Sequence, residues 1–412
     1  MAHERIVAIQ KPSQDQQERT CVPKNATREG RRTRSPRAES WDEPGGRIVA
    51  QLRRNGAMSR RRLSAYSRLS EWKDVAPKKQ DDGPHGVVAI AYGKTHLELL
   101  GYLHAVLDSG EISARTFRLT GDILPYNYAC YTVWKLRRQC LFELDMDVQH
   151  ELDELEETTI ENHKNYQVWW HRRECLQRSP REQKEKELEF LERVFALDPK
   201  NYHAWEHRQW VVRELGAWER EMDVTETMIR DDPRNNSAWS QRHWAANRGS
   251  TPNASDAPLA TCESELEAEV LFTTSIVKLV PHSESPWNYL RGLLQIGWGK
   301  QTIRRQMKSK MIGLVRSFCE KTTAEVSDCR HCIALLADIL AEPCFTSDPE
   351  TSLSVAQQAD IVRASELYRQ LRGLDQIRAN YWHLRESQVL TACSHLPPEQ
   401  AEAGVEDGRG KT

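Results

Sequence analysis

The sequence lacks several features that would assign it to a common class of protein. No run of apolar residues approaches the ~18–20 residues that a membrane-spanning helix needs, so we expect no stable insertion into a bilayer. The first residues, Met-Ala-His-Glu-Arg-Ile, do not follow the basic-then-apolar order of a secretory signal. The ten cysteines follow no disulfide-framework spacing, which favours a reducing compartment and a cytoplasmic location.

Motifs for a self-sufficient catalytic centre are also missing. The chain has no Ser/His/Asp order, no glycine-rich loop that would hold a phosphate and no cluster of metal-ligand residues. One close cysteine pair, Cys329 and Cys332, has no second pair at zinc-site spacing, so we interpret both as residues of a helix face and expect no metal on this chain. The net charge of −2 over 412 residues argues against a general nucleic-acid binder.

What the sequence does contain is a short pattern that recurs four times between residues 131 and 244. An aromatic residue or Asn is followed three positions later by a Trp, and the Trp three positions later by an Arg. The tryptophans are 35, 36 and 34 residues apart: Trp134, Trp169, Trp205 and Trp239. A period of this length indicates stacked supersecondary units rather than a single-core globule. We expect the tryptophans to be buried and to hold helix pairs together, and the arginines to bridge carboxylates or helix-end carbonyls of neighbouring units.

The residues between the repeats predict pairs of helices. Apolar residues in 187–197 form one helical stripe, and Asp198-Pro199 ends the helix because Pro disfavours helical backbone at the residue before it. Asn201 then supplies a helix cap. We therefore predict an all-α fold, a right-handed superhelical crescent of antiparallel helix pairs similar to a tetratricopeptide solenoid, which begins near residue 95 and ends near residue 390.

The chain is predicted to have three parts. Residues 1–65, rich in Arg, Ser, Pro and Gln, predict a disordered basic N-terminal arm; residues 1–70 carry 16 Lys/Arg against 7 Asp/Glu. Residues 70–395 form the helical repeat domain, with a fifth unit at Trp287 and an echo at Trp382. The extra length before Trp287 falls in 248–261, a polar stretch that predicts a surface loop. Residues 396–412 form a polar tail.

The repeat signature resembles that of protein prenyltransferase alpha subunits over roughly residues 70–385. The segments that carry the resemblance are Lys164-Asn-Tyr-Gln-Val-Trp169, Asn201-Tyr-His-Ala-Trp205, Asn235-Asn-Ser-Ala-Trp239 and Lys278-Leu-Val-Pro-His282. Tetratricopeptide repeats have a similar length, but their Gly/Ala/Pro pattern is absent. The chain departs from the family at three positions: Cys130 replaces Asn, His163 replaces Pro, and Trp170 replaces His.

The resemblance implies transfer of a farnesyl or geranylgeranyl group from its diphosphate to the cysteine of a C-terminal CaaX box. The departing diphosphate gains negative charge, which a Lys cation and a Tyr hydroxyl can stabilise. By resemblance, Lys164 and Tyr166 are the catalytic residues, at a helix start where unpaired backbone N–H groups also favour an anion. Tyr202 and His203 occupy the equivalent corner of the next repeat as substrate-binding residues, although helix-entry packing explains them equally well. Gln167 matches a glutamine that hydrogen-bonds the free carboxylate of the substrate.

The resemblance also implies a partner. A separate beta subunit would carry the zinc ligands and most of the residues that line the isoprenoid, and the assembled heterodimer would use zinc and magnesium. The substrates would be an isoprenoid diphosphate and CaaX-box proteins such as small GTPases. Two alternatives remain open: the alpha subunit of Rab geranylgeranyltransferase, whose added leucine-rich-repeat domain has no room in residues 390–412, and a non-catalytic helical scaffold in which Lys164 is replaceable.

Overall fold

The computed structural model describes residues 65–79, 90–247, 263–295, 302–346 and 353–393. The predicted arm, the loop at 248–261 and the polar tail lie outside these residues, apart from Ala65. The described residues form helices and no strands, as predicted. The short helices are η1 (Tyr66–Arg68), η2 (Ser70–Trp72), η3 (Leu124–Tyr126) and η6 (Gln376–Arg378). The longer helices are α2 (Lys94–Ser109), α3 (Ala114–Ile123), α4 (Tyr131–Glu143), α5 (Val148–Glu161), α6 (Tyr166–Leu176), α7 (Arg181–Leu197), α8 (Tyr202–Leu215), α9 (Trp218–Asp231), α10 (Asn236–Ala246), α11 (Glu263–Leu279), α12 (Glu284–Gln295), α13 (Thr302–Glu325), α14 (Arg330–Thr346), α15 (Val355–Leu374) and α16 (Ala379–Cys393).

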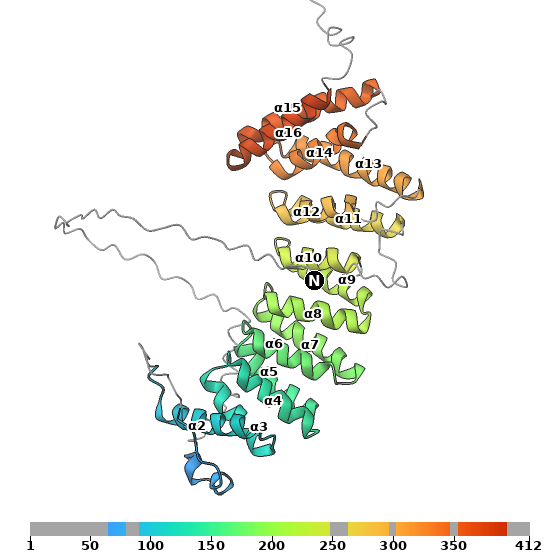
Figure 1. Cartoon of the computed structure of the whole chain (residues 1–412). Coiled ribbons are helices and arrows are strands. Elements are labelled where there is room, and N and C mark those ends of the chain that lie inside the picture. The colour runs from blue at the N-terminus through green and yellow to red at the C-terminus, as the bar shows by residue number, and fades with distance from the viewer. Residues whose placement is uncertain (1–64, 80–89, 248–262, 296–301, 347–352, 394–412) are drawn as a thin grey trace, which may run out of the picture.

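Successive helices pack as pairs, and the pairs stack into one curved column (Figure 1). The second helix of each pair contacts the second helix of the next, in an unbroken series α4, α6, α8, α10, α12, α14 and α16. In Figure 1, α6, α8, α10 and α12 form one side of the column, and α7, α9, α11 and α13 form the other. This architecture confirms the predicted all-α solenoid. It also places equivalent residues of successive second helices in a row along one face.

The repeated tryptophans hold the turns of the helix pairs. In five repeats the indole Nε1 donates to the backbone carbonyl six residues upstream, at 2.8–3.0 Å. The donors are Trp134, Trp169, Trp205, Trp239 and Trp287, and the acceptors are Tyr128, His163, Pro199, Pro233 and Pro281. All five indoles are buried. Three of them also pack against a ring of the next second helix, with centroids 4.8–5.3 Å apart. The predicted structural role of the tryptophans is confirmed.

Asparagines cap the second helices and connect neighbouring turns. The side chains of Asn165, Asn201 and Asn235 each accept a hydrogen bond from a backbone N–H in the first turn of the helix that follows. The carboxamide of Asn201 also donates to the carbonyl of His163, and that of Asn235 to the carbonyl of Pro199. These two carbonyls also accept the indole N–H groups of Trp169 and Trp205. Each carbonyl oxygen therefore accepts one hydrogen bond from an indole and one from the carboxamide of a capping asparagine. Cys130, which holds the same position before α4, makes no side-chain cap bond.

The repeated arginines pair with buried glutamates of the following repeat. These ion pairs are Arg137–Glu151, Arg172–Glu187, Arg208–Glu221 and Arg242–Glu269. Each glutamate also accepts a hydrogen bond from a residue 20 positions further on, namely His171, His207, Gln241 and Tyr289. Burial alone would raise the pKa of Glu151 and Glu187, but the bonds and charges of their partners outweigh it and hold both at about 2. The carboxylates are therefore ionised links between layers.

The C-terminal end of the column departs from the repeat. Trp382 donates its indole N–H to the carboxylate of Asp375 rather than to a backbone carbonyl, and Arg385 reaches Asp338 on α14. Cys332 lies on α14, but Cys329 precedes the helix and donates to the carbonyl of Pro281, so the prediction of two helix-face cysteines was half right. Among the described residues, no helix combines the length and apolar character needed to cross a bilayer.

Candidate active site

The segment from Lys164 to Gln167 forms the entrance of α6. Asn165 orders it by accepting the backbone N–H of Gln167 at 2.9 Å. Lys164 stands one residue before this cap, with 77% of its side chain exposed. Its Nζ lies 3.9 Å from a carboxylate oxygen of Asp198, a residue in the turn that leads to α8. Lys164 is therefore an exposed cation held loosely at the edge where two repeats meet.

Two tyrosines and a histidine gather at this edge. Tyr166 and Tyr202 are the first residues of α6 and α8, and their side chains are 50% and 74% exposed. The ring centroid of His203 lies 6.3 Å from that of Tyr166 and 5.6 Å from that of Tyr202. The structure thus brings three of the predicted residues into ring contact. Lys164 joins the same corner through Asp198.

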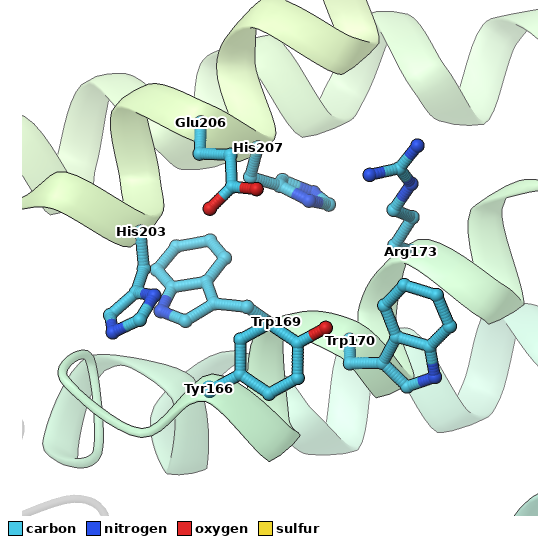
Figure 2. A pocket seen from close by; sticks show the side chains of 7 residues that line it. All are labelled: Tyr166, Trp169, Trp170, Arg173, His203, Glu206 and His207. Atoms are coloured by element: carbon cyan, nitrogen blue, oxygen red, sulfur yellow. The ribbon is translucent and has the colours of Figure 1, made fainter. Parts of the chain in front are cut away.

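A small pocket of about 370 Å³ opens between α6 and α8 beside these rings (Figure 2). Of the five predicted site residues, only Tyr166 and His203 line it. The remaining lining residues are Trp169, Trp170, Arg173, Glu206 and His207. Trp170 stacks on Tyr166 with centroids 6.2 Å apart, so the tryptophan that replaces the family's histidine supports the tyrosine ring. Lys164, Gln167 and Tyr202 lie outside the pocket wall.

Gln167 follows Tyr166 in the first turn of α6 and is partly buried. Its side-chain amide makes no hydrogen bond with any residue that the structure describes, although its backbone N–H is held by Asn165. An amide left without a partner at a partly buried position can bind an external group. Gln167 therefore has the chemistry expected of a substrate contact but does not share the pocket with His203.

The pocket wall rests on the buried network between layers. His207 lies 5.3 Å from the Trp169 ring by centroid distance, and its Nε2 lies 2.9 Å from the carboxylate of Glu187. That carboxylate is fixed in turn by Arg172. Arg173 also lines the pocket; its guanidinium lies 5.0 Å from the centroid of Trp210, and its buried Nε makes no hydrogen bond with the described residues. The pocket wall thus contains a hydrogen-bond donor that the described residues do not use.

This arrangement can stabilise an anion. An exposed ammonium and two phenol hydroxyls can contact negative charge that approaches from outside the column. Among the described residues, no group of three or more His, Cys, Asp or Glu side chains is placed to hold a metal ion.

Inspection of the sequence did not identify Trp170, Arg173 and Glu206 as pocket residues. A register signal was present, because Trp170 and Glu206 each directly follow a repeat tryptophan and Arg173 stands four positions after one. Residues at those offsets share the exposed side of successive second helices. Combining the 36-residue period with the helical period would have placed them beside Tyr166 and His203.

The class of protein follows from a match between four segments of the chain and a known family. The model of the protein prenyltransferase alpha subunit repeat matches residues 148–179, 184–215, 218–248 and 266–296. These four segments coincide with the pairs α5–α6, α7–α8, α9–α10 and α11–α12. Three of the four buried Arg–Glu links and the pocket therefore lie wholly within repeats of this class.

Relatives extend the match to most of the chain. The protein farnesyltransferase/geranylgeranyltransferase type-1 subunit alpha of Pisum sativum is 34% identical over 330 residues, which cover 78% of this chain and 94% of the relative. The subunit of the same name from Arabidopsis thaliana is 36% identical over 333 residues, covering 79% and 97%. The chain belongs to this family of protein prenyltransferase alpha subunits. The structure of Candida albicans protein geranylgeranyltransferase-I complexed with GGPP shares the fold, with a TM-score of 0.61 at 22% identity over 77% of this chain and 98% of that one.

Proposed function

We propose that this chain is the alpha half of a heterodimeric protein prenyltransferase that transfers farnesyl or geranylgeranyl from its diphosphate to the cysteine of a C-terminal CaaX box. One observation carries the proposal. Lys164, Tyr166, Tyr202 and His203 form an exposed polar edge across two layers, in a chain whose relatives are named as such subunits. An incomplete anion-stabilising edge is what one half of a shared active site requires.

The role of this edge follows from the charge that develops during transfer. As the bond between the isoprenoid carbon and the diphosphate oxygen breaks, negative charge accumulates on the leaving group. The ammonium of Lys164 sits on a flexible stem, and its nearest partner, Asp198, lies 3.9 Å away, so the ammonium can leave this contact and approach the leaving group. The hydroxyl of Tyr166 donates a hydrogen bond to the same group. His203 and Trp170 hold the tyrosine ring between them.

The other half of the site belongs to a beta subunit in this proposal. Zinc held by that subunit would lower the pKa of the CaaX thiol so that the thiolate attacks, and magnesium would accompany the diphosphate. The ligands for zinc are assigned to the partner, as the resemblance implies; among the described residues no group of three or more His, Cys, Asp or Glu side chains is placed to hold a metal ion. Gln167 would bind the free carboxylate of a CaaX protein such as a small GTPase. A cytoplasmic location fits these substrates.

The choice between farnesyl and geranylgeranyl is assigned to the beta subunit, since the names of the relatives combine both activities. Co-expression of the full chain with farnesyltransferase and type I geranylgeranyltransferase beta subunits tests the proposal. We expect a stable heterodimer with at least one of them and turnover of a CaaX peptide with the matching isoprenoid diphosphate. Failure to assemble with either subunit would favour the scaffold alternative. Assembly and turnover only with a Rab geranylgeranyltransferase beta subunit would favour the alternative that this chain is a Rab geranylgeranyltransferase alpha subunit.

A further inference from the structure

A second pocket lies further along the column, where α12, α14 and the segment η6–α16 begin. It spans about 800 Å³, solvent at its mouth included, which is roughly twice the same measure for the pocket between α6 and α8. Three consecutive second helices present their N-terminal ends to it, and these ends carry partial positive charge. The polar side chains around the opening come from all three helices, so the pocket is part of the repeat architecture.

Three arginines and three carboxylates line this pocket, and one of the arginines has no partner among the described residues. Arg378 bonds to the carboxylate of Asp375 at 3.0 Å and lies 4.0 Å from Glu284. Asp338 is the acceptor for Arg291, Arg385 and the hydroxyl of Tyr368. Arg330, the first residue of α14, is exposed and makes no ion pair or hydrogen bond with the described residues. Asp338 and Asp375 are thus already hydrogen-bonded, whereas Arg330 has all its donors available.

His331 is an independent observation that points to a ligand in this pocket. Its side chain lines the pocket and is only 9% exposed, yet neither ring nitrogen has a hydrogen-bond partner among the described residues. Burial, reinforced by the charges of Arg330, Arg378 and Arg291, lowers its pKa, so the ring is neutral and presents one donor and one acceptor. Buried polar groups in proteins are nearly always paired. An imidazole in this position is complementary to a hydrogen-bonding group that enters from outside.

The pocket occupies the same register as the candidate active site. The residues of α12 that line the pocket stand at fixed offsets from Trp287: Glu284 is three positions before it, Asn288 one after it and Arg291 four after it. Tyr166, Trp170 and Arg173 stand at those same offsets from Trp169. Equivalent offsets on stacked second helices face the same side of the column. A protein that covers the Tyr166–His203 edge and continues along the same face would reach this pocket.

We propose that this C-terminal pocket is an anchoring site for an acidic side chain of the partner subunit, whose carboxylate binds Arg330 and His331. The inference rests on the proposed function, because that function supplies a partner on this face. The unpaired guanidinium of Arg330 and the three helix N-termini favour a carboxylate over a neutral group. The anchor is separate from the residues assigned to the reaction, so it governs assembly rather than the chemical step.

The test uses the full chain co-expressed with its beta subunit and compares Arg330→Glu with Arg363→Glu. Arg363 is an exposed arginine of α15, on a first helix, and receives the same change of charge. We expect Arg330→Glu to weaken the heterodimer by about tenfold or more and to flatten the salt dependence of its dissociation constant. Arg363→Glu should leave both unchanged. Turnover per assembled heterodimer should match the wild type in both variants, and an acidic-to-lysine substitution on the partner should restore binding to Arg330→Glu.

Several outcomes would overturn this anchor. Wild-type affinity and salt dependence in Arg330→Glu would exclude it while leaving the proposed function intact. Binding of inorganic phosphate that stabilises the wild-type chain but not Arg330→Glu, with unchanged heterodimer affinity, would make the pocket a small-anion site instead. The variant His331→Ala separates loss of binding from misfolding. Its melting temperature should stay within a few degrees of the wild type, and it should still weaken heterodimer assembly. If the wild-type chain binds no beta subunit at all, it is the proposed function that fails.

Discussion

Arg172 and Glu187 form a buried double hydrogen bond between adjacent repeats, with Nε–Oε1 and Nη2–Oε2 distances of 3.0 and 2.5 Å. Both side chains are almost completely buried. The same carboxylate is also hydrogen-bonded to His207, whose ring packs against Trp169 at the pocket wall. One ion pair therefore fixes the spacing of two layers and the floor of the candidate active site.

Glu187→Gln should destabilise the chain by ~3–5 kcal/mol, because it leaves the charge of Arg172 buried without compensation. The matched control is Glu156→Gln, which breaks the exposed pair between Glu156 and Arg193 and should cost less than ~1 kcal/mol. Urea unfolding of both variants gives the comparison. Equal losses in the two variants would mean that the buried pair is not a principal link between layers.

Cys130→Asn should stabilise the chain by ~1 kcal/mol, since it supplies the missing side-chain cap of α4. The asparagines before α6, α8 and α10 show the geometry that the new residue would adopt. Cys130→Ala provides the control and should bring no gain. A melting temperature that rises equally in both variants would point to removal of the thiol as the cause.

Stability should fall in two stages as the pH is lowered. Burial lowers the pKa of His171 below its ordinary value of 6.5, so its contribution is complete above about pH 6.5 and is lost as the pH falls toward the folded-state pKa. Glu151 and Glu187 have folded pKa values of about 2 against 4.5, so their contribution is lost between those values. In the second stage the carboxylates that link the layers become protonated.

His96, His243 and His331 also have lowered pKa values and contribute to the first stage. His171→Gln tests the share of His171, because glutamine can donate to Glu151 as Gln241 donates to Glu221. Urea midpoints at about pH 7.5 and about pH 5.5 should differ less in this variant than in the wild type. An unchanged difference would show that His171 is not the group whose protonation destabilises the fold in this range.

Gln167→Leu should raise KM for a CaaX peptide by about 10- to 100-fold with little change in kcat, because a hydrogen bond to a charged carboxylate is worth ~1.5–3 kcal/mol. A peptide with an amidated C-terminus is the matched substrate control. It should bind weakly to both enzymes and show no further loss in the variant. A similar KM for the free-acid peptide in variant and wild type would remove Gln167 from the substrate site.

The repeat period of the tryptophans was sufficient to predict the fold, because each Trp closes one turn and the turns set the stacking. The buried glutamates were not predicted, although each precedes a repeat tryptophan by 18 residues, as Glu151 does Trp169. A charged residue in a helix is normally assigned to solvent unless its partner is known. At the candidate site, sequence predicted the shared corner of Tyr166, Tyr202 and His203. It did not predict that Lys164 and Gln167 lie outside the pocket, since this depends on side-chain direction at a helix entrance.

The central claim is that Lys164 stabilises the leaving diphosphate, and the single-turnover rate of the assembled heterodimer tests it most directly. Lys200 is the matched control, because it stands one residue before the Asn201 cap as Lys164 stands before Asn165, and its Nζ lies 3.7 Å from Asp232. We predict that Lys164→Ala slows transfer by about 10²–10³ while heterodimer formation and isoprenoid binding are largely kept. Lys164→Arg should recover part of the rate, and Lys200→Ala should retain nearly all of it. A wild-type single-turnover rate in Lys164→Ala, or an equal loss in Lys200→Ala, would contradict this account.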